Sequence, residues 1–259
     1  MTEPIIFYDI PSKDSPSRTW SPNTWKTRFC LNVKGIPYKT VWVEYPDIAA
    51  LIQKIGALPT DVNDDGTPYY SLPAIYDPNT KTALADSAAI VRYLDRTYPD
   101  TYCLVPAHTD ALHAAFGRGY SSLLTLSPII VPQTVYLLPP RSAEYFRTTR
   151  EVYYEKKLEE VSPPGSANRA ELWAGVEKAF ATYTKWLAAG GKEQRFFLGE
   201  NIGYADVTIA SILMWMRVVF GAESKEWKEV TAWDGGRWAR HADFFKKFEA
   251  VDVGEAAEI

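Results

Sequence analysis

The sequence contains few of the residues that build disulfide frameworks, metal centres or basic docking surfaces. It has two cysteines and three histidines among 259 residues, and a formal net charge of −4. The absence of a C-x-x-C pair argues against a dithiol oxidoreductase. The histidines show no zinc-ligand spacing, so no metal is assigned. Without a basic surplus, neither nucleic acid nor a membrane is an expected partner.

Long apolar runs are also missing. No stretch approaches the roughly 20 apolar residues that a transmembrane helix needs. The N-terminal residues MTEPIIFYDIPSKD do not resemble a signal peptide. Cys30 and Cys103 are therefore expected to be free thiols in a reducing compartment, and the protein is expected to be cytoplasmic.

Apolar and aromatic residues, by contrast, are plentiful. Hydrophobic residues make up 46% of the chain and aromatic residues 14%, with nine tryptophans. The length favours two domains, and a core of this size needs no disulfides. Aromatic side chains build large cores, but they also suit a site for flat organic molecules.

The first hundred residues alternate between strand and helix patterns. Ser21 as N-cap, Pro22 in the first turn and Gly35 after the last turn delimit the first helix. A polar loop is expected at 61–68. The predicted strands are 4–9, 38–44, 72–76 and 82–85, and the predicted helices are 22–34, 47–55 and 86–97. This order predicts a thioredoxin-like α+β domain over residues 1–98.

Helical periods dominate after a linker at 99–106. An all-α domain is therefore expected over residues 107–259, with prolines at 128, 132, 139 and 140 breaking its first part. Asn168 with Glu171 resembles a capping box. The predicted helices are 142–161, 168–189, 201–220 and 238–248, the third being the most apolar.

Leu72-Pro73-Ala74 is the first segment that is a candidate for ligand binding. A proline that opens a strand after a polar loop suits a cis peptide. Such a bond leaves the preceding backbone groups open to pairing with an extended peptide. A trans proline on an edge strand, without any ligand, is the plainer alternative.

Asp86-Ser87 opens a predicted helix, where free N–H groups and the helix dipole attract a carboxylate. The hydroxyl adds a donor, and Asp86 can pair with an ammonium group. Together the two residues fit the α-carboxylate and α-ammonium of an amino acid. A simple N-cap is the commoner role of such a pair.

Ser21-Pro22-Asn23 opens the first helix. A thiolate is the reactive form of a thiol, whose pKa is ordinarily about 8.5. A hydroxyl or amide donor beside the helix dipole would lower that pKa. Ser21 or Asn23 fits this role, as a donor and not as a nucleophile. A plain N-cap is again the alternative.

These segments, in this order and spacing, resemble glutathione transferases over nearly the whole chain. Leu72-Pro73 resembles the family's cis-proline. Asp86-Ser87, followed by Ile90 and Tyr93-Leu94, resembles its (E/D)-S-x-x-I-x-x-Y-L signature. The segment 203–206 (GYAD) resembles the capping box of the family's second domain, with glycine where Ser or Thr is usual.

The octapeptide 21–28 (SPNTWKTR) narrows the resemblance. It is similar to the S-P-x-x-W-(K/R)-T-(K/R) run of bacterial lignin β-etherases and of the related fungal, or FuA, class. Omega-type members have Cys at the position of Ser21, which favours mixed disulfides, whereas Ser favours thiolate stabilisation. The resemblance implies an enzyme that activates glutathione for attack on aromatic or ether electrophiles, in detoxification of plant or wood polyphenols.

The same resemblance implies a glutathione site with an adjoining pocket between the domains. Asp86 and Ser87 would hold the γ-glutamyl end, and the segment 72–74 the cysteinyl backbone, with Ala74 pairing to it. Ser21 and Asn23 are the candidate thiol donors. The candidates for the glycine carboxylate are Lys39 and Lys54, and those for the co-substrate pocket are Trp20, Trp25, Tyr120, Ser121 and Trp215.

A ligandin-like carrier is the main alternative function. Fungal members of this group are thought to bind aromatic compounds without transforming them, and a carrier needs the same pocket. The sequence favours neither enzyme nor carrier. A non-enzymatic assembly module is a second alternative, against which Ser21 and Asp86-Ser87 speak. The resemblance also implies a homodimer.

Overall fold

The computed structural model describes residues 3–15, 19–119, 123 and 125–258. The chain forms two compact units, each built from more than one segment. The first comprises Met1–Leu104, Leu138–Ser142 and Lys247–Ile259, and the second comprises Val105–Leu137 and Ala143–Lys246. The division therefore falls near the predicted linker, but the segments 138–142 and 247–259 belong to the first unit and not to the second.

A five-stranded sheet forms the centre of the first unit. Its strand order is β6 (Thr82–Ala85), β5 (Ala74–Asp77), β1 (Ile5–Asp9), β2 (Tyr38–Trp42) and β7 (Glu255–Ala256). β1 pairs in parallel with β2 and antiparallel with β5, and β5 and β6 form a hairpin. Because β1 lies in the middle, its apolar run is almost entirely buried.

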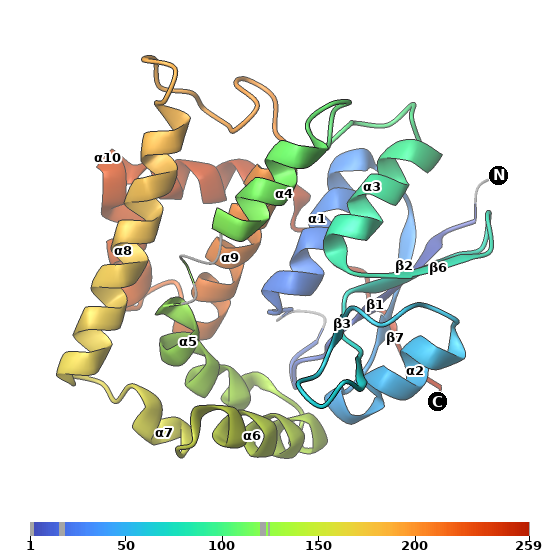
Figure 1. The fold of residues 1–259 in the computed structure, drawn as a ribbon, viewed down its shortest axis with the longest axis horizontal. Helices are drawn as coiled ribbons and strands as arrows, with labels where there is room; N and C mark the ends of the chain where they lie inside the picture. The colour runs from blue at the N-terminus through green and yellow to red at the C-terminus, as the bar shows by residue number, and fades with distance from the viewer. Residues whose placement is uncertain (1–2, 16–18, 120–122, 124, 259) are drawn as a thin grey trace. The chain divides into compact units, whose positions relative to one another are not determined.

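Three helices cover the two faces of this sheet. They are α1 (Pro22–Lys34), α2 (Ile48–Lys54), which follows a short 3-10 turn at Tyr45–Asp47, and α3 (Ser87–Thr97). α1 and α3 pack beside each other on one face, and α2 lies on the other (Figure 1). α1 ends at Gly35 with φ 65°, the left-handed conformation that glycine adopts without strain. The N-termini of α1 and α3 are thereby carried by one rigid layer.

The segment predicted as a polar loop at 61–68 contains a small hairpin. β3 (Asp61–Val62) pairs antiparallel with β4 (Pro68–Tyr69). The turn between them is closed by side-chain bonds, including Thr67 Oγ1 to Asp65 Oδ1 at 2.6 Å. Strands of two exposed residues carry no alternating pattern, so sequence reasoning missed them.

The tail, residues 247–258, returns to the first unit, which the sequence does not predict. Its strand β7 pairs in parallel with β2 and forms the edge of the sheet. Three side chains of the first unit hold its backbone: Asn32 Nδ2 donates to the Phe248 carbonyl at 2.7 Å, Trp42 Nε1 to Val253 at 3.0 Å and Lys54 Nζ to Glu258 at 2.8 Å. The tail thus covers a sheet edge that would otherwise expose unpaired backbone groups.

The second unit is helical, as predicted. Its helices are α4 (Asp110–Gly119), α5 (Ser127–Thr134), most of α6 (Pro140–Tyr154), α7 (Leu158–Val161), α8 (Ala167–Leu187), α9 (Tyr204–Phe220) and α10 (Lys225–Phe245). The apolar helix α9 is buried along most of its length. Within the described part of the chain, no helix is both long and apolar enough to cross a membrane.

Several helix boundaries in this unit differ from the predictions. Ser166, not Asn168, caps α8, because its side chain accepts the Arg169 N–H at 3.1 Å. The predicted helix 142–161 is two helices, α6 and α7. α10 begins well before residue 238, and non-helical residues at 233–236 divide it, which hides its first half from a periodicity argument.

The start of α9 explains the unusual glycine of the capping box. Asp206 Oδ2 accepts the Gly203 N–H at 2.8 Å, and Asp206 Oδ1 accepts the Phe197 N–H at 3.2 Å. A Cβ atom on Gly203 would lie 2.7 Å from Leu198 Cδ1. A serine or threonine would require the Leu198 side chain to shift, and with glycine only the carboxylate half of the box remains.

Candidate functional site

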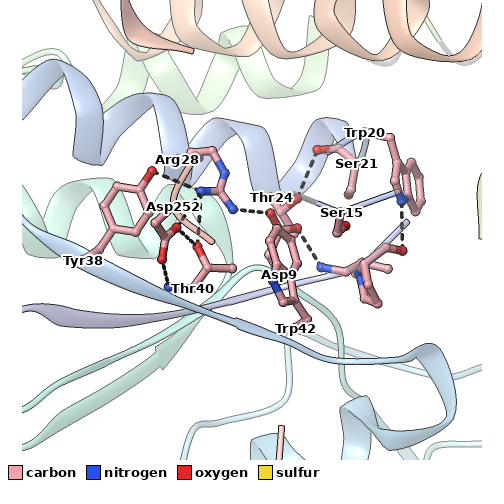
Figure 2. Close-up of polar contacts among 12 residues, drawn as sticks. Asp9, Ser15, Trp20, Ser21, Thr24, Arg28, Tyr38, Thr40, Trp42 and Asp252 are labelled. Carbon is pink, nitrogen blue, oxygen red and sulfur yellow. Dashed lines mark hydrogen bonds and ion pairs between the residues drawn. The ribbon is translucent and has the colours of Figure 1, made fainter. Parts of the chain in front are cut away.

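The first helix begins at a serine whose hydroxyl does not cap it. The Ser21 carbonyl accepts the Trp25 N–H at 2.9 Å. It also accepts the Thr24 hydroxyl at 3.2 Å (Figure 2). The Ser21 side chain makes no cap bond, and its Oγ has no partner among the residues described. The residue is only 3% exposed. A nearly buried hydroxyl without an internal partner, at a helix N-terminus, can donate to a ligand.

Asn23 lies in the first turn of α1 with an exposed side chain. Its Oδ1 accepts a hydrogen bond from Lys26 Nζ at 2.9 Å. Burial lowers the pKa of Lys26 to about 8, while the Asp86 carboxylate acts in the opposite direction. Lys26 therefore lies within electrostatic reach of both helix N-termini. Sequence reasoning gave this lysine no role.

Asp86 caps α3 from an unusual backbone conformation. Its φ of 78° and ψ of 123° are strained for a residue other than glycine. Its Oδ1 accepts the N–H groups of Ala88 and Ala89, both at 2.9 Å. Oδ2 has no partner within the described ranges, so Asp86 can cap the helix and still bind an ammonium group. Ser87, the first residue of α3, is buried beside it.

The Leu72–Pro73 peptide bond is cis, as the sequence predicts. The expected pairing of Ala74 with glutathione stays a prediction. Ala74 pairs with Tyr8 on one side and with Ala85 on the other, so its backbone lies inside the sheet. Leu72 lies outside the strands and has no backbone partner in the described part of the chain. The backbone open to an extended peptide is therefore that of Leu72.

The two candidate lysines have different surroundings. The side chain of Lys39 is exposed on β2. Lys54, at the end of α2, is also exposed, but its ammonium group donates to the Glu258 carbonyl of the tail. Their assignment to a carboxylate stays a prediction.

The tryptophans predicted to line the co-substrate pocket are buried. Trp20 and Trp25 are 3% and 2% exposed, and Trp215 is 9% exposed. Each has an interior contact: Trp20 Nε1 donates to the Pro11 carbonyl, Trp25 packs on Phe29, and Trp215 Nε1 donates to Thr134. Core packing accounts for all three, and their role in a pocket stays a prediction. Tyr120 and Ser121 lie outside the described residues.

Arg28, the last residue of the octapeptide, forms a buried ion pair that sequence reasoning did not assign. Its Nη2 lies 2.7 Å from Asp9 Oδ2, and the side chains are 0% and 2% exposed. Burial alone would lower the pKa of Arg28, but Asp9 and Tyr38 raise it above its usual value. Asp9 also accepts the Ile10 N–H at 2.6 Å. The pair therefore joins the end of β1 to α1.

The tail completes this cluster from the other side. Arg28 Nη1 donates to Tyr38 at 3.0 Å and to Thr40 at 3.2 Å, and lies 3.5 Å from Asp252 Oδ1 (Figure 2). Asp252 in turn accepts the Thr40 N–H at 2.7 Å and the Thr40 hydroxyl. Rings of Phe7, Trp25, Tyr38 and Trp42 surround the guanidinium, with centroids 4.9 Å, 5.7 Å, 5.4 Å and 5.7 Å away.

The second unit contains a cavity of about 380 Å³ between the end of α8 and α10. Charged side chains dominate its lining, and the predicted co-substrate residues do not contribute to it. Among the residues that the structure describes, no group of three or more His, Cys, Asp or Glu side chains is placed to hold a metal ion.

Comparison with known families gives a match for each part of the chain. Residues 20–97 match the glutathione S-transferase N-terminal domain, and residues 111–248 match the glutathione S-transferase C-terminal domain. The glutathione S-transferase-like protein ustS of Aspergillus flavus is 31% identical over 246 residues, which cover 91% of this chain and 87% of that protein.

Solved structures are similar over almost the full length. The glutathione S-transferase CsGST63524 of Ceriporiopsis subvermispora, crystallised with glutathione, has a TM-score of 0.93 and 50% identity, covering 96% of this chain and 99% of that one. Glutathione transferase GSTFuA3 from Phanerochaete chrysosporium has a TM-score of 0.91 and 44% identity, covering 98% and 100%. These comparisons confirm the predicted fold and the resemblance to the fungal FuA class.

Proposed function

The chain belongs to the glutathione S-transferase family, and from this membership we propose that it ionises the glutathione thiol at the start of α1 and transfers the sulfur to aromatic or ether electrophiles. The observation that carries the proposal is the hydroxyl of Ser21, which stands at a helix N-cap without capping the helix. A related structure at 50% identity was crystallised with glutathione, which supports glutathione as the co-substrate.

Glutathione would be held by the first unit. The γ-glutamyl ammonium would pair with Asp86 Oδ2, and its carboxylate would accept from the hydroxyl and N–H of Ser87. The cysteinyl backbone would pair with the open backbone of Leu72. The glycine carboxylate would meet the ammonium of Lys39 or Lys54. All of these groups belong to the first unit.

The thiol would then lie at the N-terminus of α1. Donors from Ser21 or Asn23 and the positive end of the helix dipole stabilise the thiolate and lower the pKa of the thiol. Each unit by which that pKa falls is worth about 1.36 kcal/mol. The thiol proton leaves to solvent, and the sulfur attacks an electrophilic carbon. A C–S bond forms as the bond to the leaving halide or aryl oxide breaks, with its electron pair going to the leaving group.

The test is a turnover and binding assay on one panel of compounds. The panel contains an activated aryl halide, a β-aryl ether and hydroxylated aromatics, each with and without glutathione. A glutathione conjugate formed with enzyme-dependent kinetics supports the proposal. Binding of aromatics regardless of glutathione, with no product, would instead assign a ligandin-like carrier. Failure of all aromatic compounds to bind or react would leave glutathione chemistry on a smaller electrophile.

We extend the proposal to the setting in which the protein works. It would act as a cytoplasmic homodimer that detoxifies plant- or wood-derived polyphenols, as the family resemblance implies. Light scattering across micromolar concentrations tests the assembly, since a monomer mass throughout contradicts a dimer.

A further inference from the structure

The side chains of Asn23 and Lys26 are joined in the first turns of α1. They are three residues apart, so both project from the same face of the helix. Lys26 Nζ lies 2.9 Å from Asn23 Oδ1. An ammonium group has only donors, whereas an amide side chain has one acceptor and one donor end. The atom of Asn23 that faces Lys26 must therefore be the carbonyl oxygen.

This contact fixes the orientation of the amide. With Oδ1 held by Lys26, the Nδ2 group of Asn23 is turned away from the lysine. Asn23 Nδ2 makes no hydrogen bond to the residues that the structure describes, and the side chain is exposed. Before glutathione binds, an amide that is free to rotate would point its oxygen towards the thiol position about as often as its nitrogen, and the oxygen would repel a thiolate. Lys26 removes that wrong orientation.

We propose that Lys26 is a positioning residue that acts through Asn23, holding its amide so that Nδ2 donates to the glutathione thiolate. The inference rests on the proposed function. It also favours Asn23 as a donor to the thiolate, a role for which Ser21 is the other candidate. Lys26 determines which atom Asn23 presents, and Ser21 has no such partner among the described residues.

The surroundings of Lys26 favour this role over that of a solvated surface lysine. The ammonium is partly buried, and the carboxylate of Asp86 acts on it from the start of α3. Its positive charge polarises the Asn23 amide and makes the Nδ2 hydrogens better donors. The competing explanation is that Lys26 only neutralises the charge of Asp86. The experiment must therefore distinguish an effect on the thiol from an effect on the γ-glutamyl end of glutathione.

The experiment compares Lys26→Met, Lys26→Arg, Asn23→Ala and the Lys26→Met/Asn23→Ala double variant. The pKa of the bound thiol is read from thiolate absorbance against pH, and kcat/KM is measured with an activated aryl halide. The affinity for S-methylglutathione, whose sulfur cannot ionise, reports the remaining contacts. Lys185→Met, at an exposed lysine of α8 in the second unit, is the matched control.

Lys26→Met is expected to raise the thiol pKa by about one unit, a tenfold change in ionisation, and to lower kcat/KM by a similar factor. The dissociation constant of this variant for S-methylglutathione should stay within about twofold of the wild-type value. Lys26→Arg should keep the wild-type thiol pKa and kcat/KM. Because arginine does not deprotonate, the thiolate absorbance of this variant against pH reports the ionisation of the thiol alone. The double variant should match Asn23→Ala, since the lysine acts through the amide.

An unchanged thiol pKa in Lys26→Met would overturn the inference, as would effects that add in the double variant. Weaker binding of S-methylglutathione with normal thiol ionisation would assign Lys26 to Asp86 instead. If wild-type protein bound neither glutathione nor S-methylglutathione, the proposed function itself would fall. If the wild-type protein binds both compounds, and Lys26→Met ionises the thiol as the wild type does, only the role of the lysine is overturned.

Discussion

Arg28 of α1 and Asp252 of the tail are 224 positions apart in the sequence, and their side chains lie 3.5 Å apart. On its other side the same guanidinium holds Asp9, at the end of β1. One buried cation therefore joins the first strand, the first helix and the returning tail. The two carboxylates are not equivalent, because Asp9 is buried while the Asp252 side chain is 33% exposed.

Asp9→Ala is expected to destabilise the protein more than Asp252→Ala. Loss of Asp9 leaves a buried charge without its main partner, which costs roughly 3–5 kcal/mol. Loss of Asp252 removes a longer ion contact that is open to solvent, together with its two bonds to Thr40, and should cost about 2 kcal/mol. Urea unfolding of both variants measures the difference. Equal destabilisation would mean that the tail, and not the ion pair, dominates the cluster.

Ser21→Ala should lower turnover while leaving the free energy of unfolding nearly unchanged. The hydroxyl makes no cap bond, so its removal takes nothing from the helix. The matched control is Ser166→Ala, since Ser166 does cap α8 and its loss should cost about 1 kcal/mol. Activity assays and thermal unfolding of both variants test this pair. A large loss of stability in Ser21→Ala would reduce the serine to a structural residue.

Ser87→Ala should weaken glutathione binding roughly ten- to a hundredfold, because a hydrogen bond to a charged carboxylate is worth about 1.5–3 kcal/mol. The cap of α3 should stay in place, since Asp86 supplies it. Calorimetric titration with glutathione gives the affinity. An unchanged dissociation constant would assign the carboxylate to another group.

The pH dependence of stability should differ between the wild type and Asp206→Asn. Burial raises the pKa of Asp206 to about 7, although hydrogen bonds from backbone N–H groups lower it. Between the unfolded value of about 4 and this pKa, the native state binds the extra proton, so the contribution of Asp206 falls as pH rises. When the pH falls from 8 to 5, the free energy of unfolding of the wild type should therefore rise by roughly 2–3 kcal/mol relative to that of the variant.

The comparison with the variant is needed because a neighbouring group has the opposite effect. Burial lowers the pKa of His241 to about 4, and its Nε2 lies 3.0 Å from the Asp206 carbonyl. A native state that resists protonation of His241 gains stability as pH rises between about 4 and 6.5. Urea unfolding of both proteins at several pH values isolates Asp206. A constant difference between the two proteins across that range would contradict its raised pKa.

Features with a local signal were predictable from the sequence. Ser21, Pro22 and Gly35 delimit α1 as expected, and the Leu72–Pro73 bond is cis. Asp86 caps α3 as its position before a helical period implies. In each case a few neighbouring residues decide the backbone conformation. Short-range rules are therefore sufficient for these positions.

Features that depend on distant partners were not predictable in this way. Nothing near Arg28 in the sequence indicates that Asp252 lies beside it. The neighbours of Ala74 in the sequence do not indicate that it pairs with strands on both sides. At the second-domain capping box, the Leu198 side chain occupies the space that a side chain on Gly203 would take. All three features depend on tertiary packing, which produces no periodic pattern in the sequence.

The return of the tail also sets an order of events during synthesis. The ribosome makes β2 early, but it makes Asp252 and β7 only after the whole second unit. Until then the growing chain has an open strand edge at β2 and a cation in α1 with part of its shell missing. Such edges are where nascent chains pair wrongly with one another. The newly made first unit is therefore expected to be most prone to such pairing before the tail closes it.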